Sequence, residues 1–183
     1  MAKTIKINCL SLINQTVDDK KTRAAYSRIM RDSDVRTEFG RRLVDRILER
    51  TADGLDKNET KFKKYKPSYV KSLSFEIYGK DANDVNLRLT GEMLDSLEAR
   101  PKGAYDVELY FIGAFSNEKA TWAIEGTKTA PKRDFFGISL DDQLEALKNT
   151  LKDFENQGFD FQVANEAASV NDVFSLDDEP EEG

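Results

Sequence analysis

Carboxylates and lysines are the residues that could do chemistry in this chain, because it has no histidine and a single cysteine, Cys9. The lack of histidine removes catalytic triads that use an imidazole base, and it removes the usual zinc sites. Asp81, Asp84 and Asp95 lack the spacing of a carboxylate metal site. No glycine-rich phosphate-binding motif is present. We therefore predict no catalytic, cofactor-binding or metal-binding residues and expect that the protein is not an enzyme.

A lysine-rich stretch, residues 57–71, is the strongest candidate for binding a partner. Aromatic residues lie between its lysines, and Pro67 is expected to break any helix through it. One interpretation is a solvated surface loop, and the other is contact with DNA phosphates or with an acidic neighbouring subunit. The lysines are Lys57, Lys61, Lys63, Lys64, Lys66 and Lys71.

Charge is unevenly distributed along the 183 residues, whose formal net charge is −6. Ten acidic residues and no lysine or arginine follow Lys152, so residues 1–152 carry a net charge of +4. We expect one domain over 1–157, with 1–17 as an arm or strand, and an acidic arm over 158–183 that is partly disordered when free. No apolar run approaches the ~20 residues of a membrane span, and no signal peptide is evident, so assembly in the cytoplasm is expected.

The N-terminal third is expected to contain a strand or arm and then two helices. Residues 4–13 alternate loosely, which predicts an extended segment and a buried Cys9, with a reactive thiol as the alternative. Residues 18–31 predict a short helix, and Ser33 or Asp34 is expected to cap a long helix that ends near Gly54. Its apolar stripe holds Val35, Phe39, Leu43 and Ile47, and the opposite face is expected to hold Arg36, Arg41, Arg42, Asp45, Arg46, Glu49 and Arg50.

The rest of the chain predicts a small sheet and a final helix. Residues 73–79 favour a strand or a helix end, and Thr90 is expected to cap a short helix over 91–99. A turn is expected at 100–103, followed by strands at 105–115 and 120–124 joined through 116–119. Ser139 is expected to cap a helix over 140–156. The predicted fold is α+β, a small antiparallel sheet flanked by a long N-terminal helix and a C-terminal helix, with extended terminal arms.

Four short segments in this order resemble the tailed-phage virion-morphogenesis family, which includes tail-completion, head–tail joining and neck proteins. They are Leu89-Thr90-Gly91-Glu92-Met93-Leu94-Asp95-Ser96-Leu97, Tyr110-Phe111-Ile112-Gly113, Ala120-Thr121-Trp122-Ala123-Ile124-Glu125-Gly126 and Pro131-Lys132-Arg133-Asp134-Phe135-Phe136-Gly137-Ile138. The resemblance spans about residues 62–157. The third segment lacks a histidine that family members commonly carry there.

The resemblance implies a structural protein of the virion neck or tail top, a tail-terminator-like subunit. It implies a homo-oligomeric ring around the DNA channel, with a hexamer as first choice and a dodecamer as the alternative. Tail tube, sheath or connector proteins would be its partners, and genomic DNA would pass through the lumen without sequence-specific contacts.

Four residues of these segments are predicted to fix a loop or to contact a partner. Trp122 is expected to pack between a strand and a helix, with an interface anchor as the alternative. Phe135 and Phe136 are expected to seat their loop in the core. Arg133 is expected to fix the loop by hydrogen bonds, within the chain or across subunits.

Two further hypotheses concern binding. The acidic arm could contact the arginine-rich face of 36–50 or the lysines of 57–71 in a neighbouring copy, because the charges are complementary. The alternative to a ring subunit is a nucleic-acid-binding or regulatory module that uses residues 57–71.

Overall fold

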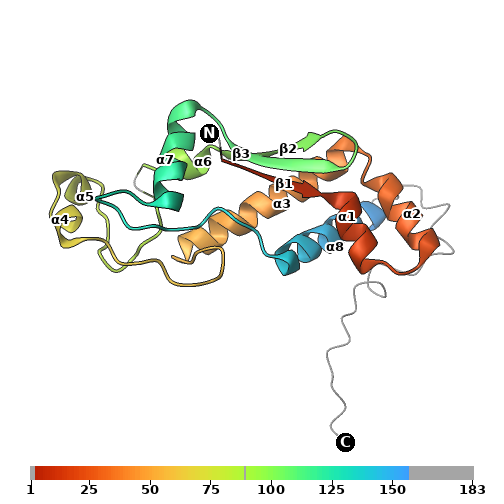
Figure 1. Cartoon of the computed structure of the whole chain (residues 1–183), viewed down its shortest axis with the longest axis horizontal. Helices are drawn as coiled ribbons and strands as arrows, with labels where there is room; N and C mark the ends of the chain where they lie inside the picture. The colour runs from red at the N-terminus through yellow and green to blue at the C-terminus, as the bar shows by residue number, and fades with distance from the viewer. Residues whose placement is uncertain (1–2, 89, 157–183) are drawn as a thin grey trace, which may run out of the picture.

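A three-stranded antiparallel sheet forms the centre of the protein in a computed structural model that describes residues 3–88 and 90–156 (Figure 1). The strands are β1 (Thr4–Asn8), β2 (Leu97–Lys102) and β3 (Asp106–Phe111), in the order β1-β3-β2. Helices cover the sheet, so the predicted α+β class is confirmed. The predicted arm over 158–183 lies outside the described residues, as does Leu89.

The two faces of the sheet differ in polarity because side chains alternate along each strand. Ile7 lies opposite Val107, and Ala99 lies opposite Leu109, on the face that turns toward the core. On the other face, Glu108 accepts hydrogen bonds from Arg100 at 2.7 Å and from Lys102 at 2.9 Å. The sheet is therefore packed on one side and charged on the other.

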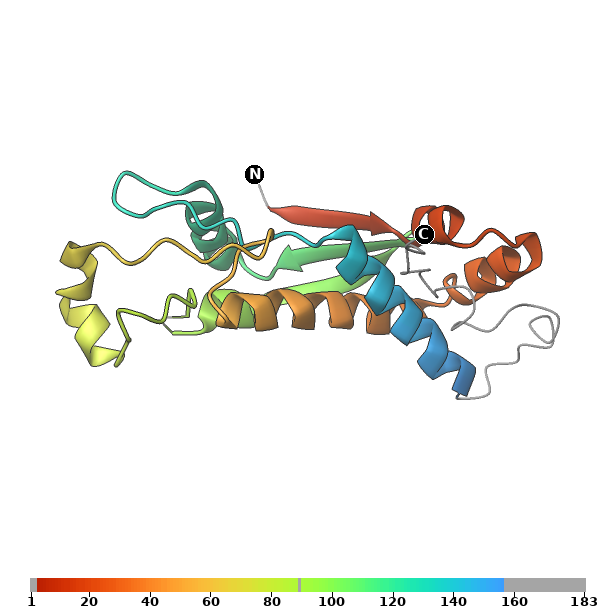
Figure 2. The same cartoon turned by 90° about the horizontal axis from the view of Figure 1, so that it is seen from below.

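The long helix α3 (Ser33–Ala52) packs along the apolar face of the sheet (Figure 2). Asp32 caps it by accepting hydrogen bonds from the backbone N–H groups of Asp34 and Val35. The helix approaches β2 most closely at Gly40, where an added Cβ would lie 2.6 Å from the Cβ of Ala99. This position needs glycine because there is no room for a side chain.

Arg36 and Arg50, expected on the solvent face of this helix, are both buried. Each is separated from Leu43 by whole turns of the helix, so both lie on the apolar stripe. The predicted solvent face was therefore wrong for these two residues. The guanidinium of Arg36 donates to the carbonyl oxygens of Met30 at 2.7 Å and Ala104 at 2.7 Å. The N-terminal end of α3 is thereby tied to the turn between β2 and β3.

Three more helices complete the body of the protein. α1 (Cys9–Thr16) follows β1 directly, so the extended segment predicted for 4–13 ends at Asn8, whose side chain caps this helix. α2 (Lys20–Ile29) follows it, and α8 (Leu140–Asn156) crosses α3. Cys9 is fully buried, and this burial raises the pKa of its thiol to about 12.

Residues 53–91 form an extension that projects from one end of the body and includes two short helices (Figure 1). α4 (Pro67–Val70) begins at Pro67, which occupies the first helical position, so no helix runs through this residue, as predicted. α5 (Leu73–Ile77) settles the alternatives for 73–79 in favour of helix.

Three predictions around the central segments were wrong in detail. The helix predicted for 91–99 is only α6 (Glu92–Asp95), preceded by Gly91 at φ 86°, and the turn predicted for 100–103 is mostly strand β2. The strand predicted for 120–124 is part of helix α7 (Ala114–Glu125). The sheet takes β1 and β2 as the neighbours of β3, so no further strand is needed to bury its apolar residues.

Among the described residues, no helix has the length and apolar character needed to span a membrane.

Candidate functional site: a basic groove and the loop that shapes it

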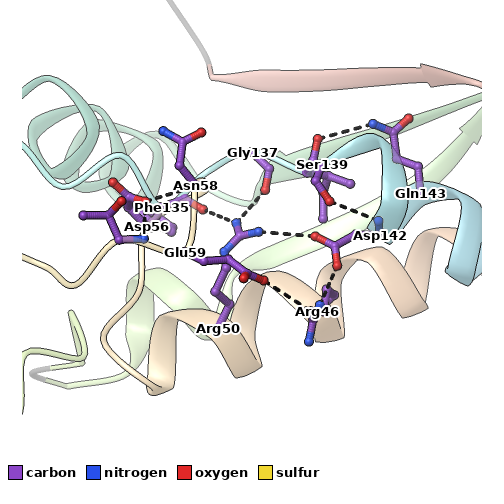
Figure 3. Close-up of polar contacts among 12 residues, drawn as sticks. Arg46, Arg50, Asp56, Asn58, Glu59, Phe135, Gly137, Ser139, Asp142 and Gln143 are labelled. Carbon is purple, nitrogen blue, oxygen red and sulfur yellow. Dashed lines mark hydrogen bonds and ion pairs between the residues drawn. The ribbon is translucent and has the colours of Figure 1, made fainter. Parts of the chain in front are cut away.

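The loop before α8 is held to α3 by a network of buried charges (Figure 3). Arg50 is 3% exposed, and its guanidinium donates to the carbonyl oxygens of Phe135 at 3.0 Å and Gly137 at 2.6 Å. The Asp142 carboxylate lies 3.6 Å from the Arg50 guanidinium and 2.7 Å from that of Arg46. The C-terminal half of α3 therefore holds both the loop and the first turn of α8.

We call the network of Arg46, Arg50 and Asp142 the clamp. Its electrostatics favour a role in holding the structure together over a role in binding a ligand. Burial opposes ionisation of Asp142, but hydrogen bonds from Arg46 and Ser139 outweigh it and lower the pKa of this carboxyl. Burial lowers the pKa of Arg50, and the nearby charge of Asp142 opposes that shift. Each charge of the network has an ion-pair partner, although Nε and Nη1 of Arg50 have no hydrogen-bond partner among the described residues.

Two phenylalanines of the same loop occupy the core, where the sequence predicted them. Phe135 and Phe136 are buried, and their ring centroids lie 6.1 Å and 4.9 Å from that of Phe111 on β3. These aromatic contacts and the Arg50 clamp fix the backbone of the loop from two sides. The fixed backbone of the loop also positions Arg133, which lies two residues before Phe135.

A groove of about 440 Å³ lies where this loop meets the extension. Its lining combines aromatic, apolar and basic side chains from segments far apart in the sequence. Tyr65, Lys66, Tyr69 and Lys80 come from the extension, and Pro131 and Arg133 come from the loop. The lining also includes Ser68, Ser72, Leu87, Thr129 and Ala130, and among the described residues it contains no carboxylate.

Arg133 is the most unusual residue of the groove. It is 7% exposed, and its guanidinium donates to the carbonyl oxygen of Lys63 at 3.1 Å and lies 5.1 Å from the ring centroid of Tyr65. Its buried Nε has no hydrogen-bond partner among the described residues. No carboxylate of the described residues forms an ion pair with this side chain. Burial lowers the pKa of Arg133, as expected for a charge whose hydration is not fully replaced. Its predicted loop-fixing role fits the bond to Lys63.

Lys80 lines the groove, although it was not among the binding residues predicted from the sequence. Its Nζ lies 5.6 Å from the Tyr65 ring centroid and donates to the side-chain oxygen of Asn86 at 2.7 Å. Burial lowers the pKa of Lys80, while the charge of Asp84 opposes this shift. A sequence signal was hard to find because Lys80 lies outside the lysine-rich stretch and reaches the groove only through the folding of the extension.

The six lysines predicted to bind a partner are all exposed, but only Lys66 lines the groove. Lys57 pairs with Asp134 at 3.1 Å, and Lys61 donates to the carbonyl oxygen of Asp53 at 3.0 Å. The segment therefore divides into lysines that stabilise the local fold and lysines that face solvent.

Trp122 does not pack between a strand and a helix. It is 45% exposed and lies on the same face of α7 as Phe115, which is also exposed. The core-packing expectation was wrong because the segment is a helix that leaves this face uncovered. The alternative role of Trp122 as an interface anchor stays a prediction.

No group of histidine, cysteine, aspartate and glutamate side chains in the described part of the chain is arranged to hold a metal ion. Comparisons of the chain with known protein families, with curated proteins and with solved structures find no match.

Proposed function

We propose that this protein is a structural subunit of a tailed-phage virion, a neck or tail-completion protein of the tail-terminator kind. Copies of the chain would form a ring at the head–tail junction, with a hexamer as first choice and a dodecamer as the alternative. The ring would contact tail tube, sheath or connector proteins and would leave a lumen for DNA. This role needs neither a catalytic centre nor a cofactor.

The observation that carries the proposal is that large apolar side chains are exposed at two separate places. On α5, Leu73 is 70% exposed and Ile77, one turn later, is 67% exposed. The second place is the end of β3 and α7, where Ile112, Phe115 and Trp122 are exposed. Exposed apolar side chains that gather on one face are typical of interaction surfaces.

Two different exposed surfaces suit a ring because each subunit of a ring contacts one neighbour with one surface and the other neighbour with another. The surface on α5 lies at the tip of the extension, away from the body, where a neighbouring copy could reach it (Figure 1). The motifs of the virion-morphogenesis family supply the second line of support, since one of them forms the clamped loop.

The test is the mass of the purified protein by light scattering, with negative-stain imaging of the same sample. We expect closed rings with a central hole, and their symmetry would distinguish six copies from twelve. Ile77→Glu should abolish the rings, while Ser74→Glu, which adds the same charge to an exposed position of the same helix, should leave them intact. A monomer would move the test to purified virions, and absence of the chain from their head–tail junction would contradict the proposal.

A second candidate is a nucleic-acid-binding module, favoured by the exposure of all six lysines in 57–71. This function requires binding of DNA that weakens steeply as salt rises, because lysine–phosphate contacts release counterions. Lys63→Glu combined with Lys64→Glu should then weaken binding. Binding that is absent at low salt would remove this candidate.

A further inference from the structure

We propose that the groove between Tyr65, Lys66, Lys80 and Arg133 binds an acidic peptide segment, namely residues 157–183 of a second copy of this chain. The inference rests on the proposed ring only for its head-to-tail arrangement of copies. It adds the occupant of the groove and the residues that bind it.

The charge of the groove indicates an anionic ligand. Three basic side chains, Lys66, Lys80 and Arg133, line it without a carboxylate among the described lining residues. Arg133 is buried and its Nε lacks a hydrogen-bond partner within the described structure. A buried guanidinium of this kind gains most from a carboxylate, because a charge-assisted pair replaces the hydration that burial removed.

The apolar part of the groove indicates that the ligand is a peptide with aromatic side chains and not a lone ion. Tyr65 and Tyr69 line the groove, and both rings pack against each other and against the buried Phe75 behind them, with ring centroids between 5.2 and 5.6 Å apart. Leu87, Ala130 and Pro131 add apolar lining. A volume of about 440 Å³ is enough for several side chains of a peptide.

Residues 157–183 have the matching composition. The 27 residues contain eight acidic residues and no lysine or arginine, and three phenylalanines lie among the acids. The phenylalanines are Phe159, Phe161 and Phe174. Acidic and aromatic side chains in one segment are what a basic, aromatic groove would select.

The position of the last described helix favours a second copy over the same chain. Along the long axis of the molecule, α8 ends on the same side as α1 and α2, whereas α4 and α5 lie at the opposite end (Figures 1 and 2). To enter its own groove, the segment would have to run back along the whole subunit. In a head-to-tail assembly, the α8 end of one copy approaches the α4–α5 end of the next.

The test is carbodiimide crosslinking of the full chain, which joins a lysine to a carboxylate only when they are in direct contact. Isotopically labelled and unlabelled chains are mixed before the protein is concentrated, and the crosslinked peptides are identified by mass spectrometry. We expect Lys66 or Lys80 to be joined to acidic residues of 157–183, in pairs that combine the two isotopes. Lys66→Glu should lower the yield of Lys80 crosslinks at least tenfold.

Lys71→Glu is the matched control, because Lys71 is exposed in the same stretch but does not line the groove. This variant should keep the crosslinks. An equal loss in both variants would show only general charge attraction and would overturn the site. Crosslinks found only in single-isotope pairs, with no mixed pairs, would overturn the second copy as donor. The absence of crosslinks from Lys66 and Lys80 would overturn the proposal, as would occupation of the groove by DNA in their place.

Light scattering on the same samples separates this inference from the proposed function. Rings without these crosslinks would overturn the inference and leave the ring proposal standing. Mixed-isotope crosslinks in open or irregular assemblies would support the inference and contradict the ring.

Discussion

The body of the protein and its extension, residues 53–91, differ in how many of their apolar residues they bury. In the body, the apolar stripe of α3, the inner face of the sheet and the loop phenylalanines bury one another completely or nearly so. In the extension, Phe62, Phe75 and Val85 are buried, but Leu73 and Ile77 lie exposed on α5. The core of the body is complete, but Ile112, Phe115 and Trp122 stay exposed at the end of β3 and on α7. Both parts therefore have apolar surface available for a partner, and the extension has it on a helix of only five residues.

Charged residues follow the same division. In the body, Arg36 and Arg50 are buried and their guanidinium groups donate hydrogen bonds to backbone carbonyl oxygens. The guanidinium of Arg50 also pairs with Asp142. In the groove beside the extension, Arg133 is equally enclosed, but it has one carbonyl oxygen and a tyrosine ring as partners. Nε has no hydrogen-bond partner among the described residues in any of the three arginines, so Arg133 differs by its single carbonyl partner and by its place in the lining of the groove.

The largest expected effect is loss of a core side chain from the body. Phe39→Ala should lower the free energy of unfolding by about 3–5 kcal/mol, because it leaves a cavity against the sheet. Leu73→Ala in the extension should change it by no more than about 0.5 kcal/mol, since that side chain is exposed. Denaturant unfolding of both variants measures the difference. Equal effects would show that the extension carries stability too.

The next effect concerns the clamp. Arg50→Met should destabilise the protein by about 2–4 kcal/mol, because the carbonyl oxygens of Phe135 and Gly137 lose their donors and Asp142 loses one cation. Arg46→Met, which removes the more exposed partner of Asp142, should cost about 1 kcal/mol or less. Chemical denaturation compares them, and a larger loss for Arg46 would reverse our assignment of the clamp.

A smaller effect is expected where α3 meets the sheet. Gly40→Ala should cost about 1–3 kcal/mol, because the new methyl group would overlap Ala99 and Val107. Thr37→Ala on the exposed side of the same helix should be nearly neutral. Thermal unfolding is sufficient to see the contrast, and an unchanged melting temperature for Gly40→Ala would mean that the helix can move away from the sheet.

The smallest effect is a dependence of stability on pH. The folded-state pKa of Asp142 is lowered, so its ionised form adds stability above the unfolded pKa of about 3.9, and this stability is lost as pH falls through the folded value. Asp142→Asn should therefore flatten the acid limb of the stability profile below about pH 4. Unfolding experiments from neutral to acid pH measure the slope, and identical slopes would assign the acid sensitivity to other carboxyl groups.

Periodic apolar residues made much of the body predictable from the sequence. The stripe Val35, Phe39, Leu43 and Ile47 predicted α3, and the alternation of Val107, Leu109 and Phe111 predicted β3. The same stripe, extended by whole turns, also reaches Arg36 and Arg50, and that spacing could have revealed their burial. Polarity suggested the opposite face, since the sequence does not show which carbonyl oxygens will meet a guanidinium.

Tertiary structure alone decided the extension, α7 and the groove. The residues of α7 were predicted to pair with the strand before them, but both sides of β3 are occupied by β1 and β2, and the segment is a helix. The groove joins Tyr65 and Lys80 to Arg133, which are separated by a long stretch of sequence and belong to no single periodic pattern. Local periodicity determines which face of an element is buried, whereas contacts between distant segments determine where unpaired charge and exposed apolar surface come together.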